Sequence, residues 1–281
     1  TTQYVNKGWV GTGSVVPNTG TTNFVAITHT NTSTITWLWG TNYWLQTSGQ
    51  TATGGVNVVS GWFGAGSNVT ITATPSNGYH FLAWTGDTNG CTPAGNQIVA
   101  PMTGPRSIAA SFQIDTFQIV ASAGPNGTIQ PSGTIWVNYG ANTNFAIAPN
   151  QNYHSVSTIV DSVDVGPTNA YTFGNVTNNH TIAAFFAIDR YTLTVASGRG
   201  APVPGVGIWT NDWGTPVLCS NDVTVLNGTT QYVNKGWVGT GSVVPNSGAT
   251  NFVAITHTNT STITWLWGTN YWLQTSGQTA T

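Results

Sequence analysis

The C-terminal stretch of this 281-residue chain repeats its N-terminal stretch almost letter for letter. Residues 1–53 and 229–281 differ only where Thr19 becomes Ser247 and Thr21 becomes Ala249, and the offset between them is constant. Near-identity at a fixed offset is typical of a tandem array, in which one structural unit is copied along the polypeptide. We therefore expect either a window on a longer repetitive protein or subunits that complete one another end to end.

The composition indicates a folded protein with very little charge. Charged residues make up 4% of the chain, glutamate is absent and the formal net charge is −2, whereas about 25% of residues are charged in an average soluble domain. Such a surface offers no electrostatic footprint for nucleic acid or an anionic membrane, and no stretch is apolar enough to insert into a bilayer. The 13 Trp, 9 Tyr and 10 Phe argue against disorder. Weak charge repulsion favours self-association into a fibre or array.

One period of the repeat divides into three segments of similar design. Each segment ends in an apolar strand pattern, and the next restarts shortly afterwards with an aromatic strand pattern. Cutting at these joins gives residues 42–114, 115–188 and 189–269, whose lengths are similar and together equal the offset between the two copies. Residues 1–41 would then be the C-terminal part of a module, and residues 270–281 the first strand of the next one.

The joins between these segments are short. Two residues separate the last apolar residue of one segment from the first aromatic residue of the next, as in Ile114-Asp115-Thr116-Phe117, and the join at Asp189 has the same form. A link of this length cannot act as a flexible tether between domains. The sequence therefore predicts stiff joints.

Alternating side chains predict β-strands along the whole chain. Residues 69–74, 107–114 and 191–195 follow a period of two, which places every second side chain in a core. Asn-Gly turns separate such stretches, for example at 77–78 and 126–127. The 34 Gly and 13 Pro are spread so that no long stretch of the sequence favours a helix. We predict an all-β fold, a tandem array of small β-sandwich-like modules of roughly 75 residues, three in each period of the repeat.

Aromatic residues recur at matching places in the segments. Tyr79 and Trp84 are five residues apart, as are Tyr232 and Trp237. An aromatic residue followed by Gly also recurs before a central strand, at residues 63–65, 139–141 and 213–215. A large side chain buries much apolar area in a small module, so we expect most of these Trp and Tyr to be core anchors.

The segments resemble a known family of extracellular repeats. The residues that carry the resemblance are 68–81 (NVTITATPSNGYHF) with 84–87 (WTGD), 139–142 (YGAN) with 148–149 and 153–154, and the closing strand 180–185 (HTIAAF). These stretches are similar to the bacterial and archaeal modules described as divergent internalin B-type repeats. Residues 236–243 and 261–265 look like a related module of very large surface proteins. The resemblance implies a secreted or surface-displayed spacer, stalk or adhesive array without catalytic residues.

No catalytic or metal-binding constellation emerges from the polar residues. Asp115 and Asp189 occupy equivalent places at the joins, which favours a linker role. Asp161 and Asp164 allow two interpretations, a weak calcium site or a solvated turn, and the turn is the better one. The histidines recur as module features without zinc-ligand spacing, and no Ser/His/Asp arrangement can be assembled. We expect no enzyme activity, metal or cofactor.

The two cysteines, Cys91 and Cys219, leave two alternatives open. Surface proteins live in oxidising surroundings, where paired cysteines usually form disulfides. Because a whole segment separates these two residues, the hypothesis is a bridge between neighbouring modules or neighbouring chains. The alternative is a pair of free buried thiols.

Seven sequons predict attachment of N-linked glycans, which would also supply the solubility that charge does not. They begin at Asn31, Asn68, Asn126, Asn175, Asn179, Asn227 and Asn259.

Three functional hypotheses follow. The leading one is a structural, extracellular or cell-surface repeat protein that forms or extends a filament, stalk or sheath. The main alternative is an adhesin or carbohydrate-binding array, in which exposed aromatic residues such as Trp44, Trp136 and Trp272 contact polysaccharide or a cell surface. Contacts of the same residues with a neighbouring module would instead favour assembly. The third is a stalk that carries an enzyme elsewhere in the full protein.

Overall fold

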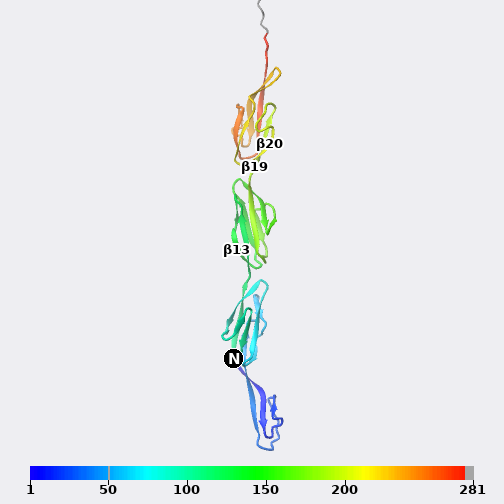
Figure 1. Ribbon diagram of the computed structural model, residues 1–281, viewed down its shortest axis with the longest axis vertical. Helices are drawn as coiled ribbons and strands as arrows, with labels where there is room; N and C mark the ends of the chain where they lie inside the picture. The colour runs from blue at the N-terminus through cyan, green and yellow to red at the C-terminus, as the bar shows by residue number, and fades with distance from the viewer. Residues whose placement is uncertain (50, 276–281) are drawn as a thin grey trace, which may run out of the picture. The chain divides into compact units, whose positions relative to one another are not determined.

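The computed structural model describes residues 1–49 and 51–275, and every regular element in them is a β-strand (Figure 1). The predicted all-β class is thus confirmed. These residues form no helix, and so none that could cross a membrane. The chain divides into two compact units, which are described separately. One contains residues 1–118, 136–143 and 173–179, and the other contains 119–135, 144–172 and the chain from His180 onward.

Strand β3 (Thr34–Thr47) crosses the predicted boundary at residues 41–42 without a break. As far as Tyr43 it pairs with β1 (Thr2–Thr12) in an antiparallel ladder. From Asn42 to Leu45 it pairs antiparallel with β5 (Gly61–Gly64), and from Leu45 to Thr47 it pairs in parallel with β10 (Arg106–Ile114). One strand therefore serves two successive sets of partners.

The strands from β3 to β10 build the first β-sandwich. One of its sheets has the order β2-β1-β3-β10-β7 with β5 on β3, so it also includes β1 and β2, which precede β3 in the chain. The other sheet has the order β4-β6-β9-β8. The remaining strands are β2 (Thr19–Gly20), β4 (Gly54–Val56), β6 (Asn68–Pro75), β7 (Tyr79–Gly86), β8 (Thr92–Ala94) and β9 (Gln97–Pro101). Alternation on β6 buries Val69 and Ile71, which pack against Leu45 and Ile108 of the first sheet.

The next segment repeats this arrangement with its own strands. Its sheets have the orders β13-β11-β18-β15-β16 and β12-β14-β17. Ile119, Phe145, Ile147 and Ile182 are buried in it. The strands are β11 (Thr116–Ala123), β12 (Gly127–Gln130), β13 (Gly133–Asn138), β14 (Thr143–Pro149), β15 (Tyr153–Val160), β16 (Val163–Asp164), β17 (Ala170–Phe173) and β18 (His180–Ile188).

The last segment has the sheet orders β20-β19-β26-β23-β22, with β24 on β23, and β21-β25. Figure 1 shows β19 beside β20, with which it forms an antiparallel ladder. The strands are β19 (Arg190–Ser197), β20 (Gly207–Asp212), β21 (Thr215–Ser220), β22 (Thr224–Asn227), β23 (Thr230–Thr240), β24 (Ser247–Gly248), β25 (Phe252–His257) and β26 (Ser261–Tyr271). The expected first strand of a further module, at 270–281, falls partly outside the described residues, which end at 275.

The first and last strands of each segment pair side by side in parallel. These pairs are β3 with β10, β11 with β18, and β19 with β26. In a parallel pair both strands run in the same direction. The chain therefore enters each segment at one end and leaves it at the opposite end, which is the geometry that a linear repeat requires.

The repeated sequence adopts two different structures. Residues 252–257 form β25, which pairs with β21. Residues 24–29 have the same sequence but form no strand, and most of their side chains are exposed. The expected burial of tryptophans is affected in the same way: Trp9 and Trp237 are buried in both copies, but Trp265 is buried and its counterpart Trp37 is not. Tertiary context, not local sequence, decides between strand and loop here.

Candidate functional site: the repeated joints

A backbone hydrogen bond recurs at each of three joints. Thr41, Asp115 and Asp189 follow one another at equal intervals along the chain. Each carbonyl accepts a hydrogen bond of 2.8 Å from the N–H of a residue that begins a turn in the following segment. The donors are Ala65, Tyr139 and Trp213. The predicted aromatic-Gly turn at 63–65 is therefore wrong by two residues. Ala65-Gly66 occupies the position in its segment that Tyr139-Gly140 occupies in the next one.

Two of the joint residues are also tied to the preceding segment. The N–H of Asp115 donates to the carbonyl of Gly78, and the N–H of Asp189 donates to that of Asn152, both at 2.9 Å. Their carboxylates pair with histidine Nδ1 atoms, His80 at 2.6 Å and His154 at 2.9 Å. His80 belongs with Asp115 in one unit, and His154 with Asp189 in the other. Each aspartate thus forms hydrogen bonds to the segment before it and to the segment after it, which supports the linker role predicted for it.

Tyr139 adds side-chain contacts to the joint at Asp115. Its hydroxyl accepts a hydrogen bond of 2.6 Å from the side-chain amide of Asn77, and its ring lies 6.3 Å from that of Phe117. A Cβ atom at Gly78 would lie 2.3 Å from the Tyr139 ring, and Gly78 has φ of +78°. Only glycine fits at this position, so the Asn-Gly turn found in the sequence serves the joint itself.

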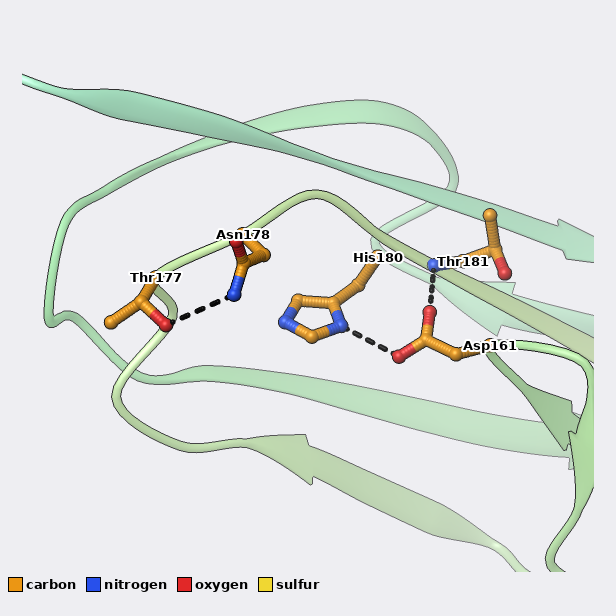
Figure 2. A network of polar contacts seen from close by, with 5 residues as sticks. All are labelled: Asp161, Thr177, Asn178, His180 and Thr181. Carbon is orange, nitrogen blue, oxygen red and sulfur yellow. Dashed lines mark hydrogen bonds and ion pairs between the residues drawn. The ribbon is translucent and has the colours of Figure 1, made fainter.

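Asp161 holds a turn against the strand that closes its segment (Figure 2). One carboxylate oxygen accepts from the His180 Nδ1 atom at 2.7 Å, and the other accepts from the Thr181 N–H at 2.8 Å. Partial burial alone would raise the pKa of the Asp161 carboxyl, but the hydrogen bonds from His180 and Thr181 outweigh it and hold that pKa below 3.8. Asp87 plays the same role one segment earlier, where it accepts from the Ser107 N–H at 2.8 Å.

Asp161→Asn should weaken the middle segment at neutral pH and reduce its sensitivity to acid. Because the folded pKa of Asp161 is depressed, its contribution is present above the usual value of 3.8 and is lost as pH falls below it. We expect a loss of about 1 kcal/mol near pH 7, since the group is partly exposed. Asparagine tolerates the left-handed φ of +48° at this residue.

Denaturant unfolding at about pH 7 and about pH 2 tests this prediction, because the difference between wild type and variant should shrink at the lower pH. Asp164→Asn is the matched control, since Asp164 accepts from the nearby Gly166 N–H, two residues away in the same turn. An equal loss at both pH values would contradict the prediction.

In the part of the chain that the structure describes, the acidic residues do not gather into a metal site. Among the described residues, no group of three or more His, Cys, Asp or Glu side chains lies close enough to hold a metal ion. Asp161 and Asp164 are both engaged in closing turns, which is the arrangement expected of the solvated-turn alternative.

Both cysteines are free in the described part of the chain. Cys91 is partly buried, and its thiol lies 3.8 Å from the Asp87 carbonyl oxygen. Cys219 packs in the core of the last segment, where burial raises the pKa of its thiol to about 11. A bridge from Cys219 to another module or chain would require that core to open, so burial favours the free-thiol alternative.

All seven sequon asparagines are exposed, so their positions are accessible to glycosylation. Asn179 uses its side-chain oxygen to accept a hydrogen bond from the Gln118 N–H at 2.8 Å. Asn31 and Asn259 accept in the same way from Ser14 and Ser242. A glycan on the amide nitrogen would leave these oxygens available, and occupancy stays a prediction.

The three tryptophans singled out in the sequence lie in different surroundings. Trp44 on β3 packs edge to face against Trp62 on β5, with ring centroids 5.4 Å apart. Trp136 on edge strand β13 is 61% exposed, and Trp272 is exposed beyond β26. Sequence reasoning missed Trp62, although it occupies the same place in its segment as Trp136 does in the next.

A comparison with protein families finds a match to part of this chain. Residues 45–116 match the divergent InlB B-repeat domain. The matched stretch runs from Leu45 on β3 to the residue after Asp115, so the match covers the first sandwich and reaches its joint. The match confirms the resemblance drawn from residues 68–87. No curated protein and no solved structure matches the chain.

Proposed function

We propose that this chain is a structural tandem-repeat protein of the cell exterior, which extends a filament, stalk or sheath through stiffly joined β-modules. InlB-type repeats are typically surface-associated, and the family match suggests a structural or binding module. Three modules in each period of the repeat would follow one another along the chain.

The observation that carries the proposal is the recurring joint. At Asp115 and Asp189 a single residue separates the last strand of one segment from the first strand of the next. That residue hydrogen-bonds through its N–H to the segment before it and through its carbonyl to the segment after it. A joint with bonds on both sides and no spare residues has little freedom to bend, which suits a protein whose task is to span distance.

The joint can be tested with the double variant Asp115→Gly and Asp189→Gly. Glycine removes both carboxylate–histidine pairs and adds backbone freedom. Because these pairs are partly exposed, each should contribute no more than about 1 kcal/mol to stability. Stiffness should change more than stability. Distances between spin labels placed in the segments on either side of one joint should be narrowly distributed in the wild type and broadly distributed in the variant.

Ser162→Gly is the control for this experiment. Ser162 has φ of +70° in a turn inside the middle segment, so glycine adds freedom there without touching a joint. Broad distances in the wild type, or narrow distances in the double variant, would refute the stiff-joint proposal.

A binding array is the second candidate, and one observation favours it. Trp136 presents an exposed indole on an edge strand, and an exposed aromatic face is suited to contact a sugar ring. Binding of the chain to cell-wall polysaccharides that is lost in Trp136→Ala would support the adhesive function. Equal binding by the two proteins would argue against it.

A further inference from the structure

The two copies of the repeated sequence differ in what covers them. Ile255 is 4% exposed in the second copy, whereas its counterpart Ile27 is 37% exposed in the first. Trp265 is 3% exposed, and its counterpart Trp37 is 39% exposed. Because the sequences are nearly identical, the difference must come from other parts of the chain. The first copy therefore presents an apolar face that the second copy keeps inside a core.

Strands β19 and β21 cover that face in the second copy. β19 pairs in parallel with β26, and β21 pairs antiparallel with β25. Leu193, Val195 and Cys219 from these strands complete the core around Trp237 and Trp265. In the first copy (blue in Figure 1), no equivalent of β19 or β21 among the described residues pairs with residues 33–37 or with residues 24–29.

The same part of the chain, residues 190–227, also supplies partners for the polar and aromatic side chains of this face. The Trp267 Nε1–H donates to the Ser197 hydroxyl at 3.1 Å, and the side chain of Asn251 donates to the Asn221 carbonyl at 3.0 Å. The Arg199 guanidinium lies over the Tyr232 ring at 4.4 Å. The counterparts of Trp267, Asn251 and Tyr232 in the first copy are Trp39, Asn23 and Tyr4, and all three are exposed.

The β1–β3 part of the uncovered face already has the shape that it has in the second copy, whereas residues 24–29 would have to form their strand on docking. The bulge between Asn6 and Gly8 in β1 repeats that between Asn234 and Gly236 in β23. Trp9 and Val15 are buried in the first copy as Trp237 and Val243 are in the second. A preformed partner surface lowers the cost of association.

We propose that residues 1–47 form a docking surface for a second copy of residues 190–227, the β19–β22 segment of this chain. The proposal rests on the proposed array function and names the contact through which one repeat continues into the next. One parallel and one antiparallel strand addition would supply the main-chain hydrogen bonds, and Leu193, Val195 and Cys219 would supply the apolar contact. The face carries almost no charge, so specificity would come from this fit of shape and hydrogen bonds.

Hydrogen exchange read by mass spectrometry tests the proposal on the full chain. Peptides that span residues 19–29 and 247–257 can be told apart, because Thr19 and Thr21 differ from Ser247 and Ala249. In the free chain, amides of 24–29 should exchange fast and those of β25 slowly. Addition of a synthetic 190–227 segment should slow exchange at 24–29 to the rate seen in β25.

A segment with Leu193→Asp is the matched control, because it would place a carboxylate in the core and should give no protection. As a second arm, residues 189–228 can be fused directly before Thr1, since Gly228 precedes the same sequence in the natural chain. The fused copy should protect 24–29 and reduce the exposure of Trp37 to solvent.

Equal protection of the two copies in the free chain would overturn the proposal, as would a fused copy that leaves 24–29 unprotected. Neither result would alter the label distances across the joints at Asp115 and Asp189, so a failure of docking is distinguishable from a failure of the array function.

Discussion

Trp265→Ala should lower the free energy of unfolding of the last segment by about 3–5 kcal/mol, the usual cost of removing a buried large aromatic side chain. Trp37→Ala, the same substitution in the first copy of the repeat, should cost no more than about 1 kcal/mol. The contrast arises because Trp265 lies inside a core with Leu193 and Val195, whereas Trp37 is 39% exposed.

Local hydrogen exchange is the appropriate measurement, because segments of a repeat protein can unfold separately. Trp265→Ala should speed exchange in β25 and β26 and leave β6 and β9 unchanged. Because both variants make the same chemical change in the same sequence, differences in helix or strand propensity cancel. Similar losses in the two variants would show that the first copy is packed as well as the second.

Leu45→Ala should destabilise the first sandwich by about 2–5 kcal/mol. Leu45 lies on β3 and is fully buried in one core with Ile71, Ile98 and Ile108. The repeat again offers a matched control, since Leu273 occupies the same place in the second copy and is exposed. Leu273→Ala should change stability by less than about 0.5 kcal/mol.

Denaturant unfolding followed by exchange of the β6 and β9 amides would measure the effect of Leu45→Ala where it occurs. Met102 and Ala100 belong to the same core, so their peptides should lose protection together. If only the β3 amides lost protection from exchange, Leu45 would stabilise β3 alone and not the sandwich, which would contradict the prediction.

Much of the fold follows from local pattern. The alternation of Val69, Ile71 and Ala73 with polar residues correctly predicts a half-buried strand. This pattern can be recognised without knowing which strands will pair with it. The fate of residues 24–29 could not be predicted in this way. Their sequence is that of β25, but strand formation depends on β21, which lies far away along the chain. Pairing of first and last strands is equally non-local.

The joints were partly predictable. Asp115 and Asp189 stand out because they recur at equivalent places, and His80 and His154 because each follows a tyrosine. That each aspartate pairs with a histidine 35 residues earlier depends on how β7 and β15 return to the joint. The contact of Tyr139 with Asn77 crosses 62 residues, and nothing in the local sequence points to it.

The parallel pairing of first and last strands determines how each segment should bear tension. When a linear array is pulled from its ends, force enters a segment through its first strand and leaves through its last. Since β19 and β26 run in the same direction side by side, that force slides one strand along the other. All hydrogen bonds of the ladder are then loaded at once, in shear, instead of being opened one after another. Each segment should consequently resist extension far more strongly than its modest core would suggest.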